Sequence, residues 1–220
     1  MSRPFPSVVL FAATTNTGKL RDFAVAGVHS GIRIESLPFL AEIAPPREDE
    51  TTFEGNARLK AEYYSRICHD CLVLADDSGL EVDALRGAPG VRSARFAEDS
   101  GFLPPETDPD VGWLGSDVVD VRNNRLLLDR MQGISNRHAR YRCVLAVARA
   151  GNTLASADGS VAGEILAVPR GRAGFGYDPL FWIPELGRTM AEITLEEKHN
   201  LSHRGRAFHA LLPKLNEILG

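Results

Sequence analysis

The sequence predicts an α/β protein built on a mixed β-sheet, and three observations carry this prediction. Short apolar runs typical of buried strands, such as 7–13 and 141–148, alternate along the chain with helical patterns. The clearest helical pattern covers 53–68, where apolar side chains recur at steps of three and four. Strands that alternate with helices favour a sheet with helices packed against it. We expect the 220 residues (1–220) to form a single domain.

Each further element follows from local pattern and turn chemistry. Thr51 or Thr52 can cap the helix at 53–68, because a threonine hydroxyl accepts from a free N–H of the first turn. The apolar run Leu72–Ala75 predicts a buried strand that ends at two aspartates and turns at Gly79. The other expected elements are a helix from the loop 14–19 to about His29, a strand at 33–37, loops at 44–51 and 98–117, a helix at 121–131, strands at 153–157 and 163–168, and a helix from Ser202.

Composition and charge exclude several classes of protein. The net charge of −4 lacks the basic balance that an electrostatic grip on nucleic acid requires. No apolar run reaches the roughly 20 residues that span a bilayer, and the first residues have no signal-peptide pattern, so we expect a cytoplasmic protein without a membrane partner. Three cysteines fit a reducing compartment, and Cys68 and Cys71 are interpreted as packed thiols rather than as a disulfide or metal site.

Asp76 and Asp77, adjacent after the apolar run, are the most informative feature of the chain. Two ionised carboxylates so close together repel each other unless a cation or a shared proton compensates them. Hard cations such as Mg²⁺ prefer oxygen ligands of this kind. Because Asp, Ser and Gly also favour turns, a solvated turn remains an alternative.

Three other segments carry groups suited to a nucleotide. The loop 14–19 lies between a strand and a helix, where backbone N–H groups bind oxyanions, although its spacing is not that of a Walker A loop. The glycine-rich segment 174–179 offers Phe175 for stacking on a base, or it is an ordinary hairpin tip. Arg204 lies in the first turn of a helix, against the charge preference of that position, which a bound anion or polar base would explain.

Six segments in order resemble the inosine triphosphate pyrophosphatase family, also called Ham1-like or non-canonical purine NTP pyrophosphatases. The resemblance runs through nearly the whole chain. The segments that carry it are 14–19, Thr52–Ala57, Leu74–Asp83, Gly87–Phe96, Gly174–Pro179 and Ser202–Gly205. Thr15 departs from the pattern, since relatives commonly have glycine there, and so does Arg47, where a second acid often stands.

The resemblance implies an elongated, curved mixed sheet flanked by helices, with two lobes and a substrate cleft between them, and a homodimer. It implies Mg²⁺-dependent hydrolysis of dITP, ITP or XTP to the monophosphate and pyrophosphate. Asp77 would be the catalytic residue and would bind the metal. Asp76, and Glu48 from the acidic loop before the helix at 53–68, are our own further candidates for ligands of the same ion. The substrate-binding residues that the resemblance implies are Thr14, Thr15, Asn16, Thr17, Gly18, Lys19, Ser78, Phe175, Gly176, Tyr177, Asp178, Lys198, His203 and Arg204.

Two other functions remain open at this point. One is a Maf-like nucleotide pyrophosphatase of different specificity, which shares a related architecture but which the segment Ser202–Arg204 does not support. The other is a non-catalytic nucleotide-binding protein in which the aspartate pair is structural. Release of pyrophosphate, and its loss with EDTA, separates an enzyme from a binding protein.

Overall fold

The structure is a computed structural model that describes residues 9–103, 115 and 117–219. Seven strands form one sheet in the order β2-β1-β3-β4-β5-β6-β7. Strand β1 pairs in parallel with β2 and β3, whereas β6 pairs antiparallel with β5 and β7, so the sheet is mixed as the sequence predicts. The strands are β1 (Val9–Ala12), β2 (Arg33–Ser36), β3 (Leu72–Val82), β4 (His138–Arg149), β5 (Asn152–Ile165), β6 (Phe181–Ile183) and β7 (Arg188–Thr189).

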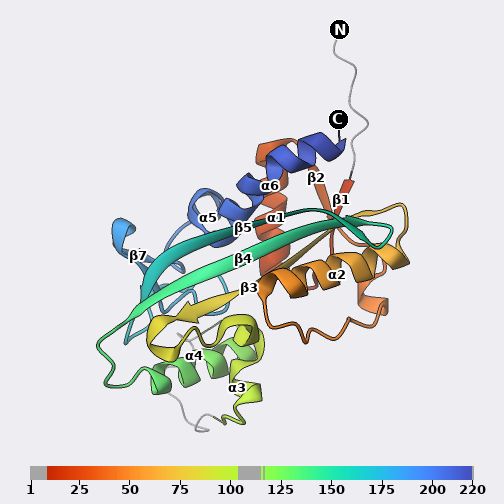
Figure 1. The fold of residues 1–220 in the computed structure, drawn as a ribbon. Coiled ribbons are helices and arrows are strands. Elements are labelled where there is room, and N and C mark those ends of the chain that lie inside the picture. Colours follow the sequence, from red (N-terminus) through yellow and green to blue (C-terminus); the bar gives the residue numbers. More distant parts are fainter. Residues whose placement is uncertain (1–8, 104–114, 116, 220) are drawn as a thin grey trace. The chain divides into compact units, whose positions relative to one another are not determined.

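The chain divides into two compact units. Unit 1 comprises 1–77, 143–159 and 199–220, and unit 2 comprises 78–142 and 160–198. The helices are α1 (Thr17–Ser30), α2 (Phe53–Ile67), α3 (Phe96–Asp99), α4 (Val118–Arg130), α5 (Leu195–Leu201) and α6 (His203–Leu219), with short 3₁₀ turns at Leu40–Glu42, Asp83–Leu85, Gly90–Arg95 and Pro184–Leu186 (Figure 1). The cleft that the family resemblance implies stays a prediction.

In unit 1, α1 and α6 pack together against one face of the sheet. Phe23 of α1 and Phe208 of α6 share a buried cluster with Leu72 and Leu74 of β3. Because successive side chains of a strand point to opposite faces, Leu72 and Leu74 define the face of β3 that meets α1 and α6, and Val73 faces the other way. This alternation decides what the next residues of β3 contact.

Helix α2 begins at the residue that its capping pattern predicts. The Thr52 hydroxyl accepts a hydrogen bond from Gly55 N at 3.0 Å, which satisfies one free N–H of the first turn. Glu54 in that turn places a negative charge at the positive end of the helix dipole. The buried face of α2 includes the apolar side chains Phe53, Ala57 and Ala61.

Unit 2 has its own apolar core. Leu127 and Met131, at the end of α4, pack with Leu80 of β3 and Phe181 of β6. Helix α4 begins three residues earlier than expected, because Asp117 caps it by accepting from Val119 N and Asp120 N. The expected loop at 98–117 contains the end of α3, and its residues 104–114 and 116 lie outside the described residues.

Two expectations about β3 and β5 are wrong. The aspartate pair does not end its strand: β3 continues through Asp76, Asp77 and Gly79 to Val82. Gly79 is needed for close packing rather than for a turn, since a Cβ there would collide with Gly90 O and the Ser93 side chain. The strands expected at 153–157 and 163–168 are one long strand, β5, whose end is Ile165.

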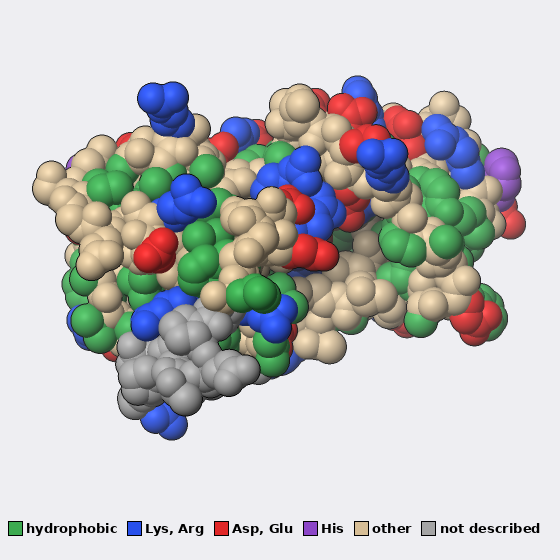
Figure 2. All heavy atoms as spheres, turned by 90° about the horizontal axis from the view of Figure 1, so that it is seen from below, with side chains coloured by type: hydrophobic (Ala, Val, Ile, Leu, Met, Phe, Trp, Pro, Cys, Tyr) green, Lys and Arg blue, Asp and Glu red, His purple; other side chains and the backbone are tan. Residues whose placement is uncertain are grey.

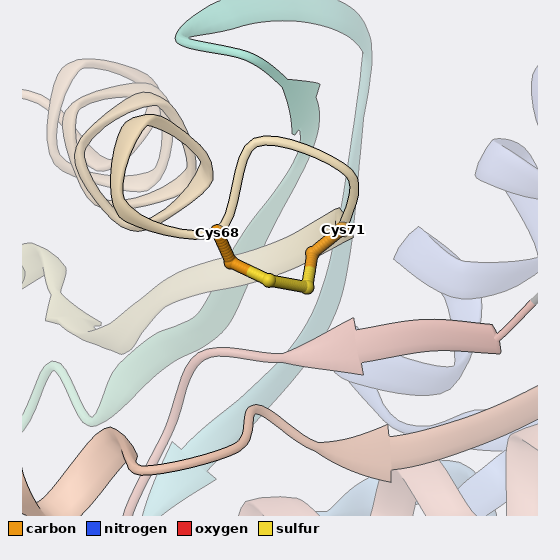
Figure 3. Close-up of a disulfide and its surroundings, with 2 residues drawn as sticks. All are labelled: Cys68 and Cys71. Atoms are coloured by element: carbon orange, nitrogen blue, oxygen red, sulfur yellow. A yellow bond between two sulfur atoms is a disulfide. The ribbon is translucent and has the colours of Figure 1, made fainter.

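Cys68 and Cys71 form a disulfide in the structure, which corrects their interpretation as packed thiols (Figure 3). The turn between α2 and β3 brings their Cα atoms to 5.3 Å, within the range that a disulfide requires. Cys71 N donates to Cys68 O at 2.9 Å, which fixes this turn. Cys143 is a free, buried thiol.

Candidate functional site

The two adjacent aspartates of β3 have different partners. Asp76 lies on the face of β3 that Leu72 and Leu74 define, and its Oδ2 is 2.8 Å from Lys19 Nζ on α1 and 3.7 Å from Arg204 Nε on α6. Asp77 points to the opposite face. Both residues are buried, with 3% and 7% of their surface exposed, so neither is a solvated turn residue.

Asp77 is held by two side chains of α2. Lys60 Nζ donates to Asp77 Oδ1 at 2.9 Å, and Asn56 Nδ2 donates to Asp77 Oδ2 at 3.2 Å. Lys60 also donates to Glu48 Oε2 at 2.9 Å. One buried ammonium therefore contacts two carboxylates that are far apart in sequence. A metal cation bound by both Glu48 and Asp77 would lie in a similar position.

Sequence reasoning missed Lys60 and Asn56. They are four residues apart on α2, among the apolar positions Phe53, Ala57 and Ala61, and so they share the buried face of this helix. Lysine is almost never buried without a partner. A lysine within the apolar stripe of an amphipathic helix was the signal that could have identified this residue.

The environment separates the pKa values of the two aspartates. Burial is the strongest influence on Asp77 and raises its pKa above the ordinary value, against the opposing effect of Lys60. Burial also disfavours ionised Asp76, but Lys19, Arg204 and Lys60 outweigh it and lower the pKa of Asp76. Burial alone would lower the pKa of Lys60, and its three carboxylate neighbours raise it instead. Asp76 is thus a fixed anion, and Asp77 is the carboxylate whose proton affinity is increased.

The partners of Arg204 explain why an arginine lies in the first turn of α6. Its guanidinium is 2.6 Å from Asp22 Oδ2 on α1 and 3.7 Å from Asp76, and the residue is only 4% exposed. Burial would lower the pKa of Arg204, but Asp76 and Asp22 raise it. Two carboxylates of the protein therefore compensate this charge, where the sequence suggested a bound anion or base. His203, beside it, is also buried.

The loop 14–19 borders the acidic pair in unit 1. The Asn16 side chain caps α1 by accepting from Lys19 N at 3.0 Å, and Thr14 Oγ1 accepts from Asn16 N at 3.2 Å. A cavity of about 290 Å³ is lined by this loop and by charged side chains. Its lining includes Thr14, Thr15, Lys19, Glu48, Lys60, Tyr64 and Asp76. A helix N-terminus, two ammonium groups and two carboxylates therefore surround one cavity.

In unit 2, the segment 174–178 is held by hydrogen bonds from several elements. Asp178 accepts from Lys198 Nζ at 2.6 Å, Phe175 N at 3.1 Å and Tyr141 Oη at 3.3 Å. Tyr177 Oη donates to Ser93 O at 2.8 Å. Gly176 donates to Asp120 Oδ2 at 2.8 Å and accepts from Asn124 at 2.7 Å. The side chains of Tyr177 and Asp178 thus have internal partners, and Phe175 is half-buried.

The residues that the sequence assigns to the site fall in both units. Unit 1 contains 14–19, Glu48, Asp76, Asp77, His203 and Arg204, and unit 2 contains Ser78, 175–178 and Lys198. Within unit 1 the structure brings together Lys19, Asp76 and Arg204, and separately Glu48, Lys60 and Asp77.

On the face drawn in Figure 2, basic and acidic side chains are intermixed. Among the described helices, none has the length and apolar composition that crossing a membrane requires.

A model of the Ham1 family matches residues 10–214 of the chain. The dITP/XTP pyrophosphatase of Acidobacterium capsulatum is 59% identical over 210 residues, which are 95% of this chain and 98% of the relative. The dITP/XTP pyrophosphatase of Geobacillus kaustophilus is 42% identical over 210 residues, which are 94% of each chain.

Solved structures are also similar to this chain. The Ham1 protein of Staphylococcus aureus is similar with a TM-score of 0.74 and 33% identity, over 96% of this chain and 99% of that one. A nucleoside-triphosphatase, dITP/XTP pyrophosphatase, from Mycobacterium abscessus is similar with a TM-score of 0.64 and 35% identity, over 94% of this chain and 100% of that one. With family match, relatives and solved structures in agreement over nearly its whole length, the chain belongs to the Ham1 family.

Proposed function

We propose that this chain hydrolyses non-canonical purine nucleoside triphosphates, dITP, ITP and XTP, to the monophosphate and pyrophosphate. The relatives named dITP/XTP pyrophosphatase support the activity and the substrate class. The observation that carries the chemistry is the meeting of Asp77 and Glu48 at Lys60, beside the cavity that the loop 14–19 lines. Removal of deaminated purine nucleotides from the nucleotide pool would be the consequence.

Different residues of unit 1 have different roles in the proposed reaction. Lys19 and the N–H groups at the start of α1 supply positive charge and donors for phosphate oxygens. Asp77 orients the attacking water and accepts its proton, a role that suits a buried carboxylate whose pKa is raised. Lys60 and Asn56 fix the position of the Asp77 carboxylate. Asp76 holds Lys19 in place and remains ionised.

Asp77 and Glu48 are the residues that fit a magnesium ion best. Both offer the hard oxygen donors that Mg²⁺ prefers, and both already contact one cation, the Lys60 ammonium. Asp76 fits less well, because its carboxylate already pairs with the positive charges of Lys19 and Arg204. When bound, Mg²⁺ would neutralise charge on the phosphate oxygens. No group of three or more His, Cys, Asp or Glu side chains in the described part of the chain is arranged as a metal site, so substrate oxygens would complete the coordination.

Recognition of the base is assigned to one aromatic ring and two donor side chains. Phe175 offers a ring for stacking, and Arg204 and His203 offer donors to the carbonyl at the purine 6-position that hypoxanthine and xanthine share. Adenine has an amino group at that position and would leave such donors unpaired. Ser78 and Lys198 would complete the substrate contacts. A homodimer and a cytoplasmic location belong to the same proposal, and sedimentation of the purified chain tests the dimer.

A nucleotide panel tests the proposed function. Pyrophosphate release is measured with dITP, ITP, XTP, dGTP and dATP, with Mg²⁺ and with EDTA. We expect hydrolysis of the first three, high selectivity over dATP, and no release in EDTA. Glu48→Gln should raise the Mg²⁺ concentration for half-maximal rate at least about tenfold, whereas Glu54→Gln, on the exposed start of α2, should not. Equal specificity constants for all five nucleotides, or activity that survives EDTA, would contradict the proposal.

A further inference from the structure

Tyr64 of α2 is a polar residue of the cavity beside loop 14–19 to which no role has been assigned so far. It lies four residues after Lys60, so both side chains share the buried face of the helix. Tyr64 is only 6% exposed, and it lines this cavity of about 290 Å³ together with Lys19 and Glu48. The residue therefore belongs to the wall of the candidate site rather than to the outer surface of α2.

Neighbouring residues hold Tyr64 in place. Its ring meets the ring of Tyr63 at an edge, with centroids 5.1 Å apart and planes at 82°. Its main-chain oxygen accepts from Cys68 N at 3.0 Å, and Cys68 is joined by the disulfide to Cys71. A tyrosine side chain has few rotatable bonds, so little conformational entropy is lost when a ligand contacts it.

The Tyr64 hydroxyl differs from the other tyrosine hydroxyls of the chain, because it forms no hydrogen bond with any described residue. The other three tyrosines each donate to an acceptor of the protein: Tyr63 to Ala44 O at 2.9 Å, Tyr141 to Asp178 Oδ1 at 3.3 Å and Tyr177 to Ser93 O at 2.8 Å. A buried tyrosine hydroxyl usually finds a partner. At Tyr64, a ligand in the cavity can supply that acceptor.

The charges around the cavity favour an anionic oxygen as this acceptor. The carboxylates of Asp76 and Glu48 already contact the ammonium groups of Lys19 and Lys60. A tyrosine hydroxyl keeps its proton at neutral pH, and burial raises the pKa of Tyr64 further, so the group is a donor. It adds this donor without a further positive charge, which would oppose a magnesium ion at Glu48.

We propose that the Tyr64 hydroxyl donates a hydrogen bond to a phosphate oxygen of the bound nucleoside triphosphate. This inference rests on the proposed function, because the ligand is the substrate of that reaction. Thr14, Thr15 and Lys19 line the same cavity and would bind other oxygens of the phosphate chain. Donors from α2 and from the start of α1 would then hold the phosphates together.

Tyr64→Phe removes the hydroxyl alone and tests this contact. The value of kcat/KM for dITP should fall about 10- to 150-fold, the range for a hydrogen bond to a charged group. Pyrophosphate and dIMP, the two products, are each titrated as inhibitors of dITP hydrolysis. At least one of them should inhibit the variant at least about tenfold more weakly than the wild type. The midpoint of urea unfolding should not change, because the hydroxyl bonds to no described residue.

Tyr63→Phe is the matched control, because it makes the same change one residue earlier, at a tyrosine that does not line this cavity. It removes the hydrogen bond to Ala44, so it should lower the urea midpoint and leave kcat/KM and product inhibition as in the wild type. Wild-type kcat/KM in Tyr64→Phe, or unchanged inhibition by both products, would overturn the inference. If the wild type itself did not hydrolyse dITP, the proposed function would fail instead, so the two failures are distinguishable.

Discussion

Lys60 Nζ lies 2.9 Å from Asp77 Oδ1, and this buried ion pair links α2 to β3 at the centre of the candidate site. The same ammonium contacts Glu48 at 2.9 Å. Because Lys60 lowers the proton affinity of Asp77 while burial raises it, the protonation of Asp77 depends on a balance between these two effects.

Asp77→Asn should reduce turnover about 10²- to 10⁴-fold, the range that a general base contributes. The amide has the shape of the carboxylate but accepts no proton from water. Pyrophosphate release with dITP measures the loss, and circular dichroism should show an unchanged fold. Asp83→Asn, at an exposed acid in the 3₁₀ turn after β3, is the control and should retain full activity. Comparable turnover by both variants would refute the role of Asp77.

Lys60→Gln should move the acidic limb of the pH–rate profile to higher pH. Asp77 must be ionised to accept a proton, and its pKa is already raised by burial. Removing the neighbouring ammonium raises that pKa further, so a smaller fraction of the enzyme is active at a given acidic pH. The measurement is kcat/KM for dITP across pH, compared with Lys214→Gln on the exposed side of α6. A limb that stays in place, or moves to lower pH, would show that Lys60 does not control this titration.

Asp76→Asn should lower the free energy of unfolding by about 3–5 kcal/mol, because it leaves the buried charge of Arg204 without one of its two carboxylates. The pKa of Asp76 is lower in the folded protein, so its contribution is present above the ordinary Asp pKa of about 3.9 and is lost as pH falls through the lower folded value. Urea unfolding at several pH values should therefore show a difference from wild type that is largest near neutrality and shrinks in acid. A difference that does not depend on pH would contradict the ion-pair explanation.

Phe175→Ala should lower kcat/KM for dITP about 5- to 150-fold, which corresponds to about 1–3 kcal/mol of base stacking. The loss should appear mainly in KM, since stacking on the base would contribute to substrate binding rather than to the reaction at the phosphates. Phe175→Tyr should retain most of the activity because it keeps the stacking surface. Phe39→Ala, at a phenylalanine that is 74% exposed in unit 1, provides the comparison. If Phe175→Ala had the KM of the wild type, the ring would not be part of the base site.

Most of the order of elements follows from the sequence, because apolar periodicity and caps such as Thr52 act locally. The short strands β6 and β7 and helix α5 were not predicted, since three, two and seven residues carry little periodicity. The expected turn at Gly79 was wrong because glycine serves there for close packing against Gly90. Local pattern does not distinguish these two uses of glycine.

The candidate site was predicted only in part, for a related physical reason. Asp77 and the loop 14–19 stand out because polar residues follow apolar runs. Lys60 and Asn56 do not, since their importance depends on a contact with β3 that lies 17 and 21 residues away in sequence. Asp76 and Asp77 have different partners because successive side chains of a strand point to opposite faces. This could not be predicted without knowing that β3 continues through both residues.

Asp178 shares one carboxylate among three internal donors: Lys198, the main chain of Phe175 and Tyr141. The shape of this segment is therefore set when the protein folds, and a nucleotide would not have to order it on arrival. A substitution at Asp178 would therefore disturb the main chain that carries the Phe175 ring, in addition to any contact of the carboxylate with the nucleotide. Comparing ligand affinity with local protection from hydrogen exchange would separate these two kinds of effect.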